Sequence, residues 1–304
     1  MPPVELKAPQ EFTLTKEPHR TSLLRFLSAL KRLTVVAGKS VKISFRNTRK
    51  MFPEGVLLFA AELDMILSSS PHPAPVRCDR PADGVVNQLF QHLGLSAKMR
   101  RKPDTVITAE NVKYWLVKTD TQVDGKHTES LINEYKDLFS AAESAKLYEG
   151  LTEAMTNAKQ HAHKEGAAEP RWWMFSQMRN DKLTVSFCDL GMGFRNSLLS
   201  EQKWPRAAVL GLIGKLGLGK ADADYIKAAF ELGKTRTQEP HRGKGLEELK
   251  EVIDTIGGHL RILSHKGYYF YEAPEGKEQC FDFDEPVPGT VISWQVHLGK
   301  GTKS

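Results

Sequence analysis

Lys182-Leu-Thr-Val-Ser-Phe-Cys-Asp-Leu-Gly-Met-Gly-Phe194 is the stretch that decides the fold of the C-terminal half. Apolar residues alternate along its first part, which predicts a β-strand from Lys182 to Cys188. Asp189 follows this strand, and Gly191 and Gly193 come at alternate positions after it. Glycines let the backbone approach a ligand closely, and a carboxylate accepts hydrogen bonds from an amine. The stretch therefore suits a binding turn, although alone it is also typical of an ordinary turn that ends a strand.

A helix predicted upstream carries polar residues at a spacing of four. Apolar side chains form one stripe between Leu147 and Ala162. Beside that stripe, Glu149, Glu153, Asn157 and His161 follow one another along one face. A carboxylate can polarise a water molecule, and an amide oxygen can ligate Mg²⁺. The same pair is also common on exposed helix surfaces, so its interpretation depends on the rest of the chain.

Two further glycine segments lie downstream. The first, Arg242-Gly-Lys-Gly-Leu246, directly precedes a helix predicted over Gly245–Ile256. Backbone N–H groups and the dipole at a helix start favour a phosphate. The second, Gly289-Thr290, opens a strand predicted over Thr290–Leu298, after strands predicted over 260–263 and 268–271. An ordinary loop before a helix has the same composition as the first segment, and the second has no meaning by itself.

Together and in this order, the four segments resemble the GHKL (Bergerat-fold, histidine-kinase-like) family of ATPases. Leu151-Thr-Glu-Ala-Met-Thr-Asn-Ala-Lys-Gln-His-Ala162 is similar to the family's N-box, and Asp189–Phe194 is similar to its DxGxG box. Gly243-Lys-Gly-Leu246 resembles the GxGL box, and Gly289-Thr290 resembles the closing Gly-Thr. The resemblance covers about residues 140–298. It implies a two-layer sandwich in which a mixed sheet packs on helices.

The resemblance also implies a role for each matching residue. Glu153 would be the catalytic residue that activates the attacking water or an incoming hydroxyl. Asn157 would hold Mg²⁺, and Asp189 would bind the adenine amino group of ATP. Residues 195–242 would form the ATP lid, in which His241 replaces a glycine found in many relatives. The other ATP-binding residues implied are Gly191, Gly193, Lys234, Arg242, Gly243, Lys244, Gly245, Leu246 and Thr290.

One segment inside the expected lid nearly matches a different phosphate-binding motif. Gly214-Lys-Leu-Gly-Leu-Gly-Lys-Ala221 has the glycines and lysine of a P-loop. Ala221, however, stands where that motif needs a serine or threonine to ligate Mg²⁺. No clear strand precedes the segment. We therefore interpret it as a flexible part of the lid.

The N-terminal half alternates between helix and strand patterns, which predicts a small α/β domain over residues 21–120. Its segment Val41-Lys-Ile-Ser-Phe-Arg-Asn-Thr-Arg-Lys-Met-Phe-Pro-Glu-Gly-Val-Leu-Leu-Phe59 resembles the switch loop and following helix of a STAS-like domain. Pro53-Glu54 replaces the family's phosphoacceptor, so the resemblance implies a docking or dimerisation module. Residues 1–20 are rich in proline and charge and predict a poorly ordered lead-in. Asn111–Val117 is a further candidate strand.

The resulting prediction is an α/β (α+β) fold in which an ATP-binding domain over residues 130–304 follows the STAS-like domain. The boundary is expected between about residues 118 and 132. The chain has 304 residues, a net charge of +6 and three widely spaced cysteines. This cysteine usage fits a reducing compartment, so a cytoplasmic location is expected. No apolar run approaches the ~18 residues of a membrane span.

Three functions remain open at this level. The first is an ATPase switch, in which Mg²⁺-dependent hydrolysis changes partner binding or dimerisation through the N-terminal domain. The second is a protein serine/threonine kinase of the anti-sigma-factor type, and the third is a non-catalytic ATP-binding scaffold. Nucleic acid is a weaker candidate partner, because the densest basic cluster is only Met99-Arg-Arg-Lys102.

Overall fold

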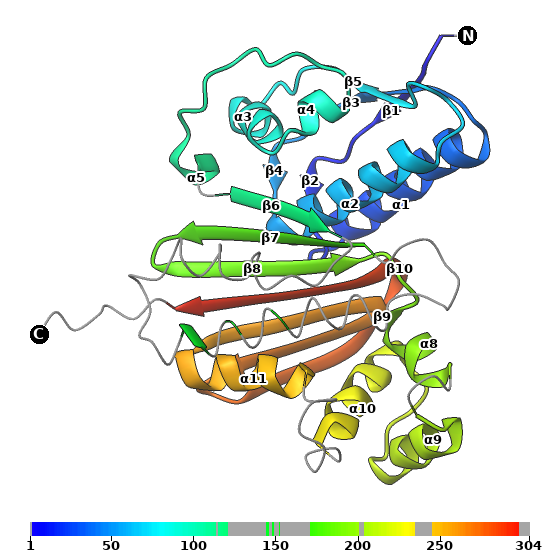
Figure 1. The fold of residues 1–304 in the computed structure, drawn as a ribbon, viewed down its shortest axis with the longest axis vertical. Helices are drawn as coiled ribbons and strands as arrows, with labels where there is room; N and C mark the ends of the chain where they lie inside the picture. The colour runs from blue at the N-terminus through cyan, green and yellow to red at the C-terminus, as the bar shows by residue number, and fades with distance from the viewer. Residues whose placement is uncertain are drawn as a thin grey trace, which may run out of the picture. The chain divides into compact units, whose positions relative to one another are not determined.

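The computed structural model describes residues 2–113, 115–120, 144–145, 148, 152, 171–200, 204–234 and 245–297 (Figure 1). The chain divides into two compact units, Met1–Lys118 with Met174–Arg179, and Thr119–Trp173 with Asn180–Ser304. The fold is mixed α+β, with parallel pairing in the first unit and antiparallel pairing in the second. None of the helices in the described ranges is long and apolar enough to cross a membrane.

The first unit contains a parallel sheet of order β1-β3-β5 and a short parallel pair of β2 with β4. These strands are β1 (Val4–Lys7), β2 (Glu11–Phe12), β3 (Val41–Ser44), β4 (Lys50–Met51) and β5 (Val76–Cys78), and β6 (Trp115–Asp120) follows them. The helical elements are α1 (His19–Lys31), the π-helical turn η1 (Arg32–Val36), α2 (Pro53–Ser69), α3 (Gly84–His92), α4 (Leu95–Lys98) and α5 (Glu110–Lys113).

The N-terminal residues differ from the expected lead-in. Val4 and Leu6 pair with Val41 and Ile43, so the first residues form an edge strand of the parallel sheet. Proline and charge predict poor order, but β3 would otherwise present unpaired N–H and C=O groups along this edge. A strand that satisfies those groups is therefore ordered despite its composition.

The candidate strand over Asn111–Val117 is wrong in its first half, which forms α5. The side-chain oxygen Oε1 of Gln88 accepts hydrogen bonds from the backbone N–H groups of Thr108 and Ala109, each at 2.8 Å. This contact from α3 holds the chain just before α5 begins at Glu110. A side chain distant in sequence thus favours a helical turn where the local pattern favours a strand.

Five phenylalanines form the centre of the first unit's core. They come from β2, α1, the residue directly after β3, α2 and α3, and are Phe12, Phe26, Phe45, Phe59 and Phe90. The centroids of neighbouring rings in this group lie 4.6–6.3 Å apart. Gly55 near the start of α2 lies so close to the backbone of Phe12 that a Cβ atom would collide with it. Tight packing of α2 on β2 therefore fixes the position of the segment that enters the helix.

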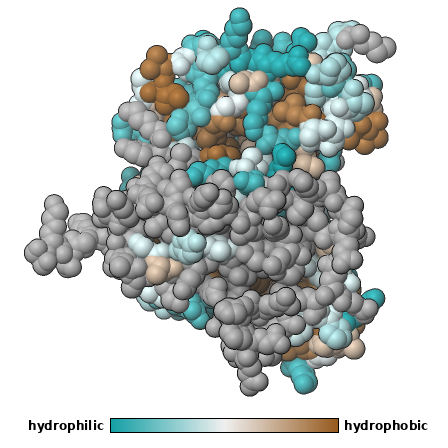
Figure 2. All heavy atoms as spheres, in the orientation of Figure 1, coloured by the Kyte–Doolittle hydropathy of each residue, from teal (hydrophilic) through white to brown (hydrophobic). Residues whose placement is uncertain are grey.

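On the face shown in Figure 2, the surface of the first unit mixes hydrophilic residues with small separate hydrophobic patches. Among its described residues, the large apolar ones with exposed side chains are Val36, Val85 and Val106. Single exposed apolar residues are normal in globular proteins, so these residues by themselves indicate no interaction.

The second unit contains the antiparallel strands β8, β10 and β9 of a sheet whose order is β6-β7-β8-β10-β9, and most residues of β6 and β7 belong to the first unit. The strands that follow β6 are β7 (Trp172–Arg179), β8 (Lys182–Asp189), β9 (Gly258–Ala273) and β10 (Lys277–His297). The described helices are α8 (Gly193–Leu199), α9 (Arg206–Lys215), α10 (Asp222–Lys234) and α11 (Gly245–Ile256). The predicted strand from Lys182 and the predicted helix over Gly245–Ile256 are confirmed.

The three strands predicted after residue 258 are in fact two long ones. A register shift between Asp282 and Thr290 lets β10 pair with β9 on both sides of it. In β9 the backbone of His265 has a positive φ of 50°, and the chain then continues as strand. Gly267 lies against the start of α10, where a Cβ atom would meet the backbone of Ala223. Packing against α10 therefore keeps β9 extended through a polar stretch that resembles a turn.

One face of the β9–β10 hairpin is covered by α10 and α11 (Figure 1). Phe230 of α10 packs on Tyr269, with ring centroids 4.8 Å apart. Lys250 of α11 places its ammonium 4.1 Å from the ring centre of Tyr271, and the Tyr271 hydroxyl donates a hydrogen bond to Asp254. The apolar stripe of each helix is thereby buried on the sheet.

The segment expected to be the lid contains three packed helices. Val209 and Ile213 of α9 join Tyr225, Ala228 and Leu232 of α10 in a buried cluster. The near-match to a P-loop at 214–221 connects α9 to α10, so a helix precedes it where a P-loop needs a strand. The described residues between 195 and 234 are therefore largely helical, and residues 201–203 and 235–242 lie outside the described ones.

Candidate functional site

Asp189 is the last residue of β8 and begins a tight turn into α8. Its Oδ1 atom accepts a hydrogen bond of 2.8 Å from the backbone N–H of Gly191. Among the described residues, the second carboxylate oxygen, Oδ2, has no hydrogen-bond partner. The turn thus orients the carboxylate through one oxygen and leaves the other available to a donor.

Gly193 is required by the geometry of this turn. Its φ is +70°, and a Cβ atom there would collide with the ring of His265 and the hydroxyl of Ser264. L-residues with a side chain rarely adopt this conformation. The glycine that the sequence places in a binding turn is therefore needed for close packing of that turn against β9.

Two side chains of β9 hold the turn in place. Ser264 Oγ accepts a hydrogen bond of 2.9 Å from the backbone N–H of Phe194. His265 Nε2 donates to the carbonyl oxygen of Met192 at 2.7 Å. The turn is consequently fixed on both sides of Gly193. Ser264 and His265 are not among the site residues predicted from the sequence, although a polar pair directly after the strand predicted over Leu260–Leu263 was a visible signal.

Thr290 lies opposite Asp189 in the pairing of β10 with β8, and opposite Ser264 in the pairing of β10 with β9. Directly opposed residues of antiparallel strands project from the same face of the sheet. The hydroxyl oxygens of Thr290 and Ser264 are 3.3 Å apart, and both side chains are buried. Asp189, Thr290 and Ser264 therefore form one polar row across three strands.

Gly289 allows β10 to approach this row. Its φ is +70°, and a Cβ atom would collide with the carbonyl oxygen of Asp189. The Gly289-Thr290 pair thus has a structural basis, because the glycine permits the close approach and Thr290 supplies a hydroxyl beside Asp189.

Burial raises the pKa of Asp189 to about 7, and the N–H of Gly191 opposes this shift only in part. A desolvated carboxyl group holds its proton until a donor or a positive charge compensates its ionised form. A ligand that donates a hydrogen bond to Oδ2 would stabilise the ionised form. The site therefore suits a group with an N–H donor, such as an exocyclic amine.

The structure describes only some of the remaining predicted site residues. Gly245 begins α11, and the Leu246 side chain is buried, so Leu246 contributes packing at the start of this helix. Lys234 is the last residue of α10. Five predicted site residues lie outside the described residues: Glu153, Asn157, Arg242, Gly243 and Lys244.

The described part of the site supplies recognition groups. Asp189, Thr290 and Ser264 offer hydrogen bonds, and the turn glycines provide close backbone approach. In the described ranges, no three histidine, cysteine, aspartate or glutamate side chains group as metal ligands. A comparison of the chain with models of known protein families and with curated proteins found no match.

Proposed function

We propose that the second unit binds ATP at the Asp189 turn and hydrolyses it with Mg²⁺, and that this reaction acts as a conformational switch. The observation that carries the proposal is the Asp189 carboxylate. One of its oxygens is held by Gly191, and the other is free of partners among the described residues. The buried hydroxyl of Thr290 lies directly across the strand pair.

Adenine fits this arrangement better than guanine. The exocyclic amine of adenine donates hydrogen bonds, and Oδ2 of Asp189 would accept one. Guanine presents a carbonyl oxygen at the corresponding ring position, which would face the carboxylate as a second acceptor. A buried acceptor without a donor costs about 1–3 kcal/mol. The site should therefore select an adenine nucleotide.

The proposed hydrolysis rests on residues assigned from the sequence resemblance. Glu153 would take a proton from the water that attacks the γ-phosphorus, while Asn157 holds Mg²⁺. The new bond joins the water oxygen to the γ-phosphorus, and the bond to the bridging oxygen breaks to release ADP. Arg242, Lys244 and the start of α11 would bind the phosphates. Mg²⁺ would neutralise phosphate charge when bound.

The first unit would then be the element that responds to nucleotide. We propose that it docks a protein partner or a second copy of the chain. Glu54, which replaces the expected phosphoacceptor, is buried and accepts a hydrogen bond of 3.4 Å from the hydroxyl of Thr13. A buried, paired carboxylate at the start of α2 supports a docking role that needs no phosphorylation of this loop.

Calorimetric titration of the full chain with ATP and Mg²⁺ tests the binding step. Asp189→Asn should weaken ATP binding at least tenfold, because the amide would turn an N–H donor toward the adenine amine. Asp181→Asn is the matched control, since Asp181 is exposed in the turn between β7 and β8 and should leave binding unchanged. Absence of ATP binding by the folded wild-type protein would rule the proposal out.

Incubation with γ-labelled ATP distinguishes hydrolysis from the two alternatives. Free labelled phosphate supports the switch, a labelled partner protein supports a kinase, and tight binding with neither product supports a scaffold. Glu153→Ala should retain ATP binding and lose turnover. Persistent turnover in that variant would show that Glu153 is not the base.

A further inference from the structure

The first unit contains a cavity of about 260 Å³ where the start of α2 meets α3 and residues of β6 and β7. Its polar rim includes Arg49, Lys50 and Arg179, and its apolar wall includes Phe52, Val86 and Trp115. This volume is slightly below the about 300 Å³ at which ligand pockets commonly begin, so the cavity can hold only a small ligand.

The charge around this cavity is one-sided. Of the described residues that line it, three have cationic side chains and none is acidic. The Lys50 ammonium is paired with Glu11, at 3.1 Å from Oε1. Among the described residues, the guanidinium group of Arg49 donates a hydrogen bond only to the carbonyl oxygen of Arg46, at 3.1 Å. Within the described ranges, neither Arg49 nor Arg179 has an acidic partner, so both guanidinium groups can pair with an anion.

The apolar wall is already formed. Val86 and Trp115 are buried, and the rings of Trp115 and Phe175 pack edge to face with centroids 4.6 Å apart. His92 Nε2 donates to the carbonyl oxygen of Trp115 at 2.7 Å, which fixes the backbone beside the cavity. A ligand would therefore meet a fixed wall and would lose little affinity to ordering of the protein.

Trp115 adds a polar feature to this wall. Its Nε1 donor is buried and has no hydrogen-bond partner among the described residues. A buried N–H without a partner costs free energy.

We propose that this cavity binds a small organic anion with an apolar body, of the kind represented by a medium-chain carboxylic acid. The carboxylate would pair with Arg49 and Arg179, and the apolar chain would lie against Phe52, Val86 and Trp115. The first unit, which would dock a partner under the proposed function, thereby acquires a ligand of its own, distinct from the nucleotide.

Calorimetry and NMR titration of the full chain with octanoate and with 1-octanol test the proposal. Octanoate should bind at least tenfold more tightly than the alcohol, because only the acid pairs with the arginines. The double variant Arg49→Gln/Arg179→Gln should weaken octanoate binding at least tenfold and leave octanol binding unchanged.

A control of equal charge change is available. Arg46 and Arg77 are exposed and do not line the cavity, so Arg46→Gln/Arg77→Gln should bind octanoate like the wild type. Val85 lines the cavity with an exposed side chain, and Val85→Asp should repel the carboxylate without loss of a buried contact.

Three results would overturn the proposal. They are no octanoate binding at millimolar concentration by folded wild-type protein, equal affinity for acid and alcohol, and equal weakening by the control pair. Mg²⁺-ATP binding, measured on the same variants, should be unchanged. Loss of octanoate binding with intact ATP binding, or the reverse, separates failure of this proposal from failure of the proposed function.

Discussion

Asp189 and Thr290 lie directly opposite each other in the antiparallel pairing of β8 with β10, although about a hundred residues separate them in sequence. Gly289 makes this approach possible, because any side chain there would meet the backbone of Asp189. The turn that follows Asp189 is held against β9 by Ser264 and His265. Three groups thus meet at the end of β8. They are the hydrogen bond from Gly191 that orients the Asp189 carboxylate, the buried hydroxyl of Thr290, and the Oδ2 atom of Asp189, which has no hydrogen-bond partner among the described residues.

Nucleotide selectivity should depend on Asp189. The wild-type protein should bind ATP at least tenfold more tightly than GTP, because guanine places an acceptor opposite Oδ2. Asp189→Asn should narrow this ratio to near one, since its amide N–H can donate to the guanine carbonyl. Competition titrations of both nucleotides on both proteins measure the ratio. If wild type and variant had the same ratio of ATP to GTP affinity, the adenine ring would have to bind away from Asp189.

The stability of the protein should depend on pH through the same residue. Burial raises the pKa of Asp189 to about 7, whereas an unfolded aspartate titrates near 3.9. Between these values the folded protein holds a proton that the unfolded chain has released, so the free energy of unfolding falls as pH rises. Above about pH 7 this dependence ends.

Asp189→Asn removes that titration. The free energy of unfolding of the variant relative to wild type should therefore rise progressively between pH 4 and pH 7, by up to about 4 kcal/mol. Urea unfolding at several pH values, without nucleotide, measures the difference, and Asp181→Asn serves as control. Parallel stability curves for variant and wild type would contradict the raised pKa.

Gly289 should tolerate substitution far less well than another glycine of positive φ. Gly289→Ala combines a left-handed conformation with a collision against Asp189, whereas Gly276 has a φ of +64° and open space around its Cβ position. The left-handed conformation alone costs about 1 kcal/mol. Gly289→Ala should cost about 2 kcal/mol more than Gly276→Ala in urea unfolding. Similar losses of free energy of unfolding in the two variants would show that β8 and β10 separate easily at Gly289.

Asp282 should stabilise α10 from outside the helix. Its two carboxylate oxygens accept hydrogen bonds from the N–H groups of Asp222 and Ala223, at 2.9 and 2.8 Å. These donors at a helix start have no partner within the helix. Asp282→Ala should therefore lower the free energy of unfolding by about 1 kcal/mol.

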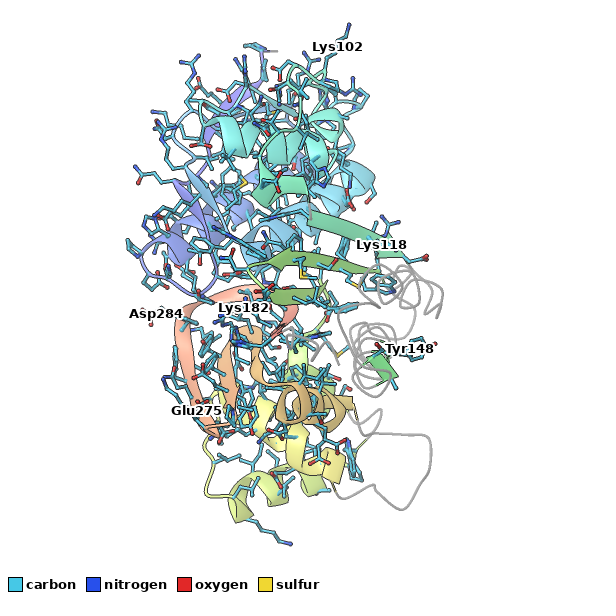
Figure 3. All side chains as sticks on the ribbon, turned by 90° about the vertical axis from the view of Figure 1, so that its left-hand side faces the viewer. Lys102, Lys118, Tyr148, Lys182, Glu275 and Asp284 are labelled. Atoms are coloured by element: carbon cyan, nitrogen blue, oxygen red, sulfur yellow. The ribbon has the colours of Figure 1, made fainter. Side chains whose placement is uncertain are left out.

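Asp284→Ala is the matched control for this effect. Asp284 lies two residues along β10 and is exposed, and Figure 3 labels it together with Glu275 of the β9–β10 turn. Its removal should change stability by less than about 0.5 kcal/mol. An equal loss in both variants would indicate a general charge effect in place of a specific cap.

The sequence by itself determined the elements whose pattern is local. Alternation from Lys182 and the apolar stripe from Gly245 correctly predicted β8 and α11, because side-chain periodicity follows directly from strand and helix geometry. It also marked Asp189 and Gly193 as a turn of interest. The roles of Glu153 and Asn157 stay predictions, since these residues lie outside the described ranges.

Only the tertiary structure decided which distant segments meet. The pairing of Thr290 with Asp189, the contacts of Ser264 and His265 with the turn, and the edge strand at Val4 all join residues remote in sequence. Such contacts form because backbone groups and apolar faces must find partners once the chain is compact. Local periodicity carries no information about which partner each one finds.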